Sequence, residues 1–200
     1  MPEEKSPASA KATAGKENLY TASEMKKVLQ NAEMALWLDS YNNIFSDFDP
    51  RPFAERALSD DFILEMKKVA RDRGKDSYEL KFLLAPETRN HHQEEVIKER
   101  LHHFFIEQHH QYIKERKGII ARGFLFVILG VVFMSVASFL LTFFANEKFL
   151  FNFLVILLEP AGWFLFWEGL SHAMYKSEQV NPEIKFYHKM AHSKIEFISY

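Results

Sequence analysis

The sequence predicts a transmembrane hairpin of two helices attached to a small cytoplasmic α+β domain. Three observations lead to this fold class: two long apolar runs, a short polar turn between them, and two alternating segments outside the runs. The apolar runs cover residues 123–144 and 149–167, and residues 145–148 form the turn. At about 1.5 Å per residue, each run is long enough as a helix to cross a hydrocarbon core of roughly 30 Å.

Both runs are expected to be helical because lipid offers no hydrogen-bond partner to backbone N–H and C=O groups. The alternative is a pair of core helices in a soluble protein. Each run, however, is close to the spanning length and is apolar on every face. A membrane hairpin therefore fits the pattern better.

The distribution of lysine and arginine predicts the orientation of the hairpin. Cations precede the first run and follow the second, whereas the turn carries only Lys148, next to Glu147. The flanking cations are Lys114, Arg116, Lys117, Arg122, Lys176, Lys185, Lys189 and Lys194. Because such residues favour the cytoplasmic side, we expect a multi-pass protein of the cell membrane with both termini in the cytoplasm.

Composition divides the chain into four parts. Residues 1–19 have almost nothing to bury and are expected to form a disordered tail. Residues 20–117 are a cytoplasmic helical and α+β segment, and residues 118–170 hold the hairpin. Residues 171–200 are a cytoplasmic segment that returns to the soluble domain.

Several helices are predicted from their end signals. Thr21 and Glu24 form a capping box, which predicts a helix that continues to about Ile44. Ser59 is a typical N-cap for a second helix, and Gly74 is a typical residue to end it. From residue 87 to residue 144 no proline interrupts the helical pattern, which indicates one long helix that enters the membrane. Asn181, Pro182 and Glu183 mark the start of a further helix.

A small sheet is predicted from two alternating segments. Residues 78–84 alternate in the manner of a strand, and Pro86 ends the pattern. Residues 194–200 also alternate, and a single strand needs a partner for its backbone. We therefore expect a two-stranded sheet that pairs residues 78–84 with 194–200. The alternative for the second segment is continuation of the preceding helix.

The composition excludes several functional classes. The net charge is −2, which provides no basic field for nucleic acid. The chain contains no cysteine, so it has no disulfide, thiolate metal site or cysteine nucleophile. The sequence contains no phosphate-binding glycine loop, dinucleotide motif, serine elbow or zinc-protease motif. We therefore expect neither an enzyme nor a bound cofactor.

One acid stands out within the apolar runs. Glu159 lies about twelve residues beyond the turn, close to the middle of the membrane. A carboxyl group at that depth costs a few kcal/mol, so we expect it to be protonated or partnered. Folding the hairpin about its turn sets Glu159 opposite Ser135, with Ser138 one turn away. These residues form either a proton or cation site, or a neutral hydrogen-bonded lock between the helices.

Small residues recur at heptad spacing on both predicted membrane helices. Seven residues are nearly two helical turns, so each set lines one face and permits close approach of the helices. The packing residues are Gly123, Gly130, Ala137, Gly162 and Gly169. At the cytoplasmic boundary, Arg122 and Glu168 are about level in the folded hairpin. This placement predicts an ion pair, with a solvated Glu168 as the alternative.

Histidine pairs recur along the predicted long helix, at residues 91–92, 102–103 and 109–110. Neighbours seven apart are about 10 Å apart along a helix, whereas chelation on one helix needs a spacing of four. We therefore predict no metal site. A solvated or pH-sensitive face, or a metal ion shared between subunits, are the alternatives.

The sequence thus predicts a membrane-tethered interaction module that associates with itself. Its expected partners are the lipid bilayer, further copies of the chain and an unidentified cytoplasmic protein, with no nucleic acid. The alternative is an oligomeric proton or cation conductor that uses Glu159, although few polar residues are available to line a pore.

Overall fold

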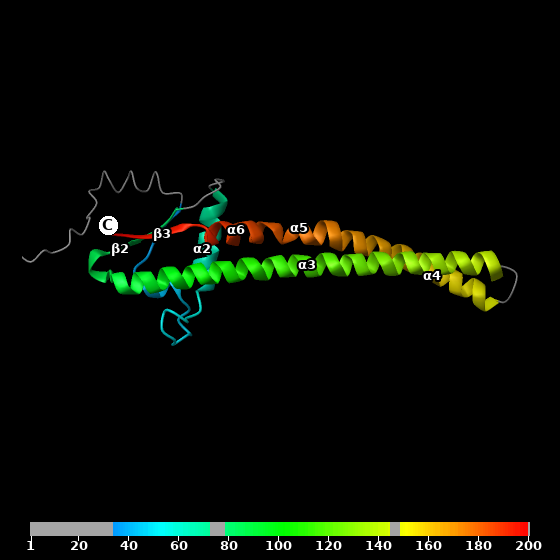
Figure 1. The fold of residues 1–200 in the computed structure, drawn as a ribbon, viewed down its shortest axis with the longest axis horizontal. Coiled ribbons are helices and arrows are strands. Elements are labelled where there is room, and N and C mark those ends of the chain that lie inside the picture. Colours follow the sequence, from blue (N-terminus) through cyan, green and yellow to red (C-terminus); the bar gives the residue numbers. More distant parts are fainter. Residues whose placement is uncertain (1–33, 73–78, 145–148, 200) are drawn as a thin grey trace, which may run out of the picture.

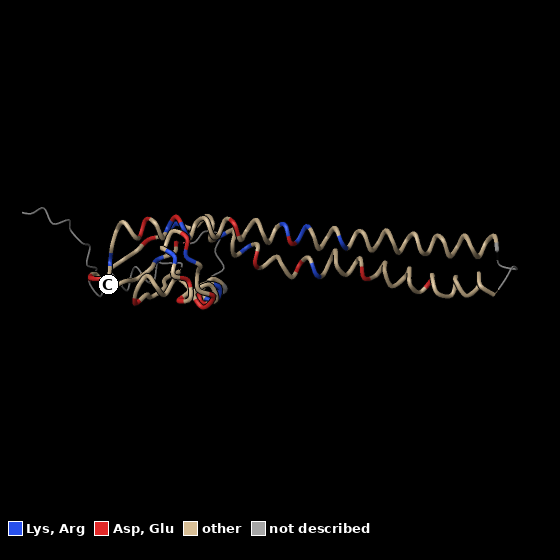
Figure 2. The backbone as a smooth tube through the Cα atoms, turned by 90° about the horizontal axis from the view of Figure 1, so that it is seen from below, with Lys and Arg blue, Asp and Glu red and all other residues tan. Residues whose placement is uncertain are grey.

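The computed structural model describes residues 34–72, 79–144 and 149–199. The chain forms a small domain around a three-stranded sheet, and two antiparallel helical arms extend from it side by side (Figure 1). Charged residues concentrate on the domain and the adjoining half of the arms, while the far half of both arms is almost free of charge (Figure 2). The molecule therefore has a charged end and an apolar end.

The outgoing arm is the single helix α3, His91–Phe144, with 54 residues. At 1.5 Å per residue it is about 81 Å long. The predicted long helix is thus confirmed, although it begins after a 3₁₀ turn, η2, at Pro86–Thr88. The sequence had placed its start at residue 87.

The returning arm consists of several helical segments in series. They are α4 (Phe149–Ser171), a π-helical turn η3 (His172–Lys176), α5 (Ser177–Gln179) and α6 (Asn181–Ala191). Helix α6 begins at Asn181 with proline in its first turn, as predicted. Helix α4 continues through Pro160.

Both arms contain a stretch long and apolar enough to cross a membrane. Only 11% of each stretch is buried within the molecule. This exposure disfavours the alternative of two buried core helices, because most apolar side chains of these stretches are not covered by the rest of the molecule. Exposed side chains include Phe124, Leu125, Ile156 and Phe164.

The sheet consists of β1 (Met34–Trp37), β2 (Glu79–Leu84) and β3 (Lys194–Ser199), in that order. All strands are parallel, and the register aligns Leu36, Phe82 and Phe197 across the sheet. The predicted pairing of 78–84 with 194–200 is confirmed for residues 79–84 and 194–199. The predicted two-stranded sheet is wrong, because β1 adds a third strand.

The helix predicted to continue to Ile44 is also wrong over its described part. Residues 34–37 are strand β1, and Tyr41–Ile44 is a short 3₁₀ helix, η1. The backbone of this segment pairs with β2, and Met34 is fully buried there. Pairing with a neighbouring strand overrides local helix propensity. The capping box at residues 21–24 and the tail at 1–19 lie outside the described residues.

Helix α2, Asp60–Asp72, begins directly after Ser59, as predicted. The Ile63 N–H donates to the Ser59 carbonyl at 3.1 Å, and two aspartates occupy the first turn. Negative charge is favourable at that end of the helix dipole. The predicted end at Gly74 lies outside the described residues.

One apolar core joins the sheet to the helices. Phe82 at its centre is fully buried and packs against Phe62 from α2 and Phe197 from β3. The first turns of α3 contribute Ile97, Leu101 and Phe105, and α6 contributes Tyr187 and Met190. Both arms therefore begin inside the core of the domain.

Deleting residues 194–200 should loosen the sheet without unfolding the apolar half of the arms. The truncation removes the β3 ladder and the buried Phe197, so β2 keeps only β1 as a neighbour. We expect faster amide exchange at Leu80–Leu84, with unchanged exchange at residues 124–140 as the internal control. Unchanged protection of β2 in the truncated chain would contradict the role of β3.

Candidate functional site

Glycines bring the backbones of the two arms together. Gly130 faces Gly162, and a Cβ atom built on Gly130 would lie 2.7 Å from the Gly162 carbonyl oxygen. One heptad nearer the domain, a Cβ on Gly123 would lie 2.8 Å from the Gly169 carbonyl oxygen. Real Cβ atoms essentially never come so close, so only glycine fits at these positions. The four predicted packing glycines therefore lie at one continuous contact.

The contact continues toward the turn with larger residues. Ala137 on α3 and Val155 on α4 are both buried. Gly118, which precedes the contact on α3, has open space around it. The close contact between α3 and α4 thus begins at Gly123 and continues along the heptad positions toward the turn.

The carboxyl group of Glu159 lies outside this contact. Its residue is exposed, although it stands in the apolar stretch of α4. At about 100° per residue, Glu159 is roughly 50° from the line through Val155 and Gly162. That rotation takes the side chain to the flank of the helix pair.

The serines predicted to meet Glu159 are exposed as well, and the hydroxyl groups of Ser135 and Thr142 bond to carbonyls of their own helix. The Ser135 Oγ donates to the Val131 carbonyl at 2.7 Å, and the Thr142 Oγ1 donates to the Ser138 carbonyl at 2.9 Å. Among the described residues, Glu159 has no hydrogen bond to either serine. The structure therefore does not bring the predicted polar site together within one chain.

The polar residues nevertheless share one side of the hairpin. Each residue can be placed by its angle around its own helix, measured from the contact line in the direction in which the chain runs. In two antiparallel helices, residues with angles between 0° and 180° lie on the same side of the pair. Glu159 lies at about 50°, Ser138 at about 90° and Ser135 at about 150°. A shallow groove runs along this side of α3 between Ser135, Ser138 and Thr142, with Val131, Met134 and Phe139 as its apolar lining.

Arg122 and Glu168, predicted to form an ion pair, have other partners in this structure. The Glu168 carboxylate binds Lys176 at 2.8 Å and contacts the His172 Nε2 at 3.1 Å. The Arg122 Nε donates to the Gly118 carbonyl at 3.3 Å on its own helix. Lys176 lies two turns farther along the same arm as Glu168, at the end of the π-helical turn.

A buried ion pair connects the domain to the start of α3. Glu94 is 2% exposed and accepts from the Arg89 Nε at 2.8 Å and the Tyr41 hydroxyl at 3.0 Å. Arg89 also donates to the Ser199 Oγ at 2.9 Å, which includes β3 in the network. Burial alone would raise the pKa of Glu94, but Arg89 and Tyr41 outweigh burial and hold that pKa below its ordinary value. The sequence analysis missed this network, which joins residues far apart in the chain.

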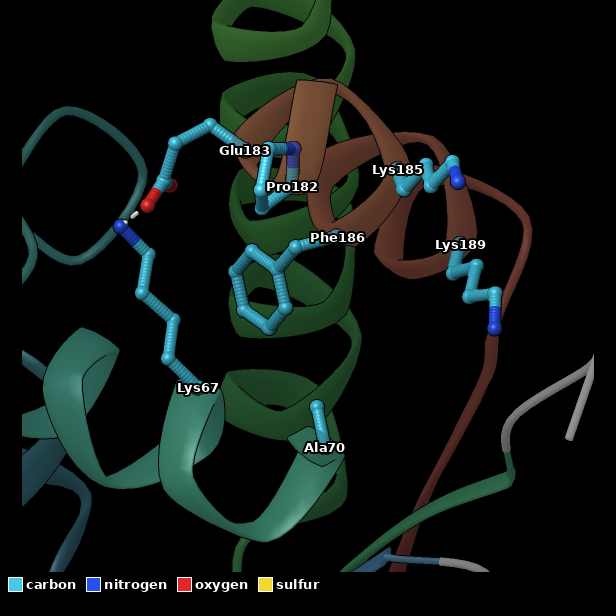
Figure 3. A pocket seen from close by; sticks show the side chains of 7 residues that line it. All are labelled: Lys67, Ala70, Pro182, Glu183, Lys185, Phe186 and Lys189. Carbon is cyan, nitrogen blue, oxygen red and sulfur yellow. Dashed lines mark ion pairs between the residues drawn. The ribbon is translucent and has the colours of Figure 1, made fainter. Parts of the chain in front are cut away.

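A cavity of about 200 Å³ lies between α2 and α6 (Figure 3). Phe186 stands at its centre, and the Lys67 amine points to Glu183, whose Oε2 it meets at 2.6 Å. Burial alone would lower the pKa of Lys67, but Glu183 and the tyrosines more than offset this effect and raise it. The cavity is smaller than typical ligand sites of roughly 300–1,000 Å³. The internal ion pair closes one wall, so we assign the cavity no ligand.

Histidines from the two arms meet near the domain. The rings of His109 on α3 and His188 on α6 have centres 5.0 Å apart, and the His188 and His192 rings are 4.5 Å apart. His110 is next to His109, with a ring separation of 6.0 Å. In this conformation no three possible ligands within the described residues converge to hold a metal ion. The sequence did contain one signal of this cluster, the spacing of four between His188 and His192.

Comparison with models of protein families, with curated proteins and with solved structures finds no match to this chain. Its function must therefore be argued from its own residues.

The glycine contact can be tested with the same substitution at two positions. Gly130→Ala places a methyl group against the backbone of α4, so the arms must separate. We expect the hairpin to lose about 1–3 kcal/mol, as in other overpacked sites. Unfolding monitored by helix content during titration with a denaturing detergent measures this loss.

Gly118→Ala is the matched control, because nothing lies within 4 Å of its Cβ position. There alanine should be neutral or should stabilise the helix by about 0.5–1 kcal/mol. Equal effects of the two substitutions would contradict a backbone contact at Gly130.

Proposed function

We propose that this protein is a membrane-anchored assembly module. The two apolar stretches form a transmembrane hairpin, and the domain around the sheet lies in the cytoplasm together with both termini. The module acts by binding and not by catalysis. Two helices of sufficient length with outward-facing apolar side chains support the anchor.

The charge distribution supports the orientation. Lys114, Arg116, Lys117 and Arg122 lie on α3 just before its apolar stretch, and Lys176 follows the apolar part of the other arm. Positive residues at this level favour the cytoplasmic side of a membrane. The domain, which adjoins this level, then lies in the cytoplasm.

Reporter fusions test this topology directly. A reporter fused after Tyr200 or inserted after residue 20 should be active on the cytoplasmic side, and one inserted at Asn146 should be active outside. The positions of the cations on both arms are the physical reason. External activity at the C-terminus would reject the proposed topology, since β3 would then be on the wrong side.

The exposed position of Glu159 is the main observation in support of self-association. A single hairpin in lipid would present this carboxyl group to hydrocarbon, at a cost of a few kcal/mol. The hydroxyl groups of Ser135, Ser138 and Thr142 lie on the same side of the hairpin, along the shallow groove. A second copy that packs on this side supplies each carboxyl with a hydroxyl partner and removes it from lipid.

The levels of these residues along the arms agree with such a contact. Gly162 lies between Gly130 and Met134 of α3, so Glu159, three residues earlier on α4, is about level with Ser135. Ser138 is then about 5 Å farther along the arm. In a symmetric pair of hairpins, the carboxyl of one copy can reach the groove of the other.

The same polar side supports a second function, an oligomeric proton or cation conductor. In that case several copies would surround a path lined by Glu159 and the hydroxyl groups. The groove is short and its lining contains no ionisable residue. Glu159, beside it, is the one ionisable residue within the two apolar runs 123–144 and 149–167. Conducting pores need rings of polar groups along their length, which favours the assembly role.

Two substitutions of Glu159 separate these functions. Glu159→Gln keeps a donor, an acceptor and the shape, so self-association should be nearly unchanged. Glu159→Leu removes the hydrogen bond and should weaken association by about 0.6–2 kcal/mol. At about 1.4 kcal/mol per tenfold change, this corresponds to roughly a threefold to thirtyfold increase in the dissociation constant.

Energy transfer between labelled copies in lipid vesicles measures the association, and ion flux in the same vesicles measures conduction. Glu115→Gln is the matched control, because Glu115 is exposed on α3 before the apolar stretch. Cation flux that disappears in Glu159→Gln while association persists would establish the conductor instead. Equal association of wild type and Glu159→Leu would refute the proposed interface.

A further inference from the structure

The histidine cluster joins the two arms where they leave the domain. His109 lies on α3, while His188 lies in the last turn of α6 and His192 caps that helix. The three rings follow one another with centre separations of 5.0 Å and 4.5 Å. None of these rings has a role in the core or in the proposed membrane contact.

The spacing of His188 and His192 suits chelation. Residues four apart lie on the same face of a helix, which is the arrangement with which helical histidine pairs bind zinc. Two imidazole rings that share one zinc ion, at about 2.0–2.1 Å from each nitrogen, have centres roughly 5 Å apart. Both observed separations are close to this value.

One ring is already held in the form that binds metal. The His192 Nδ1 lies 2.8 Å from the His188 carbonyl oxygen, to which it can donate. Ligating histidines almost always donate their second ring N–H in this way, which leaves the Nε2 lone pair free for the ion. The same hydrogen bond also caps the C-terminus of α6, so His192 can serve the helix and a metal ion with one ring orientation.

The helix end that carries two of these rings also favours a cation. The C-terminus of α6 carries the negative end of the helix dipole, and His188 and His192 stand at that end.

The geometry points to a divalent transition-metal site formed by His188 and His192, with His109 as the third ligand from the opposite arm. The rings do not converge in the present conformation. His188 and His192 are exposed and His109 is half-buried, so changes of side-chain rotamer can bring their nitrogens together. The bound ion would clamp α3 to α6 at the base of the arms, with water as its fourth ligand.

Zinc titration of the full chain in detergent, without a histidine tag, tests the site. Competition with a chromophoric chelator should show one zinc ion per chain. Zinc should also raise the midpoint of thermal unfolding, because it binds only the folded arrangement of the arms. Cobalt should give the visible absorption of a tetrahedral site.

Single substitutions identify the ligands. His188→Gln and His192→Gln should each weaken zinc binding by about 100-fold or more, beyond the roughly 10–100-fold typical of an outer-shell partner. His109→Gln should weaken it as well and abolish the thermal stabilisation. His103→Gln is the matched control, since His103 is exposed on α3 about two turns before His109 and should bind zinc like wild type.

Several results would overturn the site. Absence of zinc binding in wild type, or binding that survives His188→Gln, would reject it outright. Wild-type affinity in His109→Gln would reject the link between the arms. One ion per two chains would place the ligands between copies. The site lies outside the apolar stretches, so none of these results bears on the Glu159 interface.

Discussion

The parallel pairing of β2 with β3 is the constraint on which this structure depends. Parallel neighbours need a long crossover connection, and here that connection consists of both helical arms. The chain leaves the sheet after β2, travels the full length of α3, and returns through α6 to complete the same sheet. The domain therefore lacks a strand until the second arm is in place.

Two kinds of contact keep the arms in register with the sheet. At the domain, the buried Glu94 is bound by Arg89 and Tyr41, and Arg89 continues to Ser199 on β3. Removing one partner of such a pair leaves a buried charge uncompensated, which is strongly destabilising. Farther out, glycines allow backbone contact between α3 and α4. Between these two regions lie the histidines, where the His109 ring on α3 meets the His188 ring on α6.

The glycine contact also determines which side chains of the hairpin stay accessible to other molecules. Because the small residues occupy the space between the arms, Glu159 lies on the flank, beside the hydroxyl groups of α3. A helix pair with larger contact residues would stand farther apart and could admit the carboxyl between its helices. Close packing within one chain thus leaves a polar side available for contact between chains.

The sequence by itself determined the elements whose signal is local. Apolar length defined the two arms, end signals located α2 and α6, and alternation identified β2 and β3. Only the tertiary structure decided which groups meet. Strand β1 has a helical pattern in its sequence because its pairing partner is distant in the chain. Glu168 pairs with Lys176 of its own arm and not with Arg122, a contact that depends on how the side chains meet in the folded arm. The sequence did not predict the histidine cluster because its members come from different helices. Periodicity along one helix carries no information about which side chains of the opposite helix lie next to it.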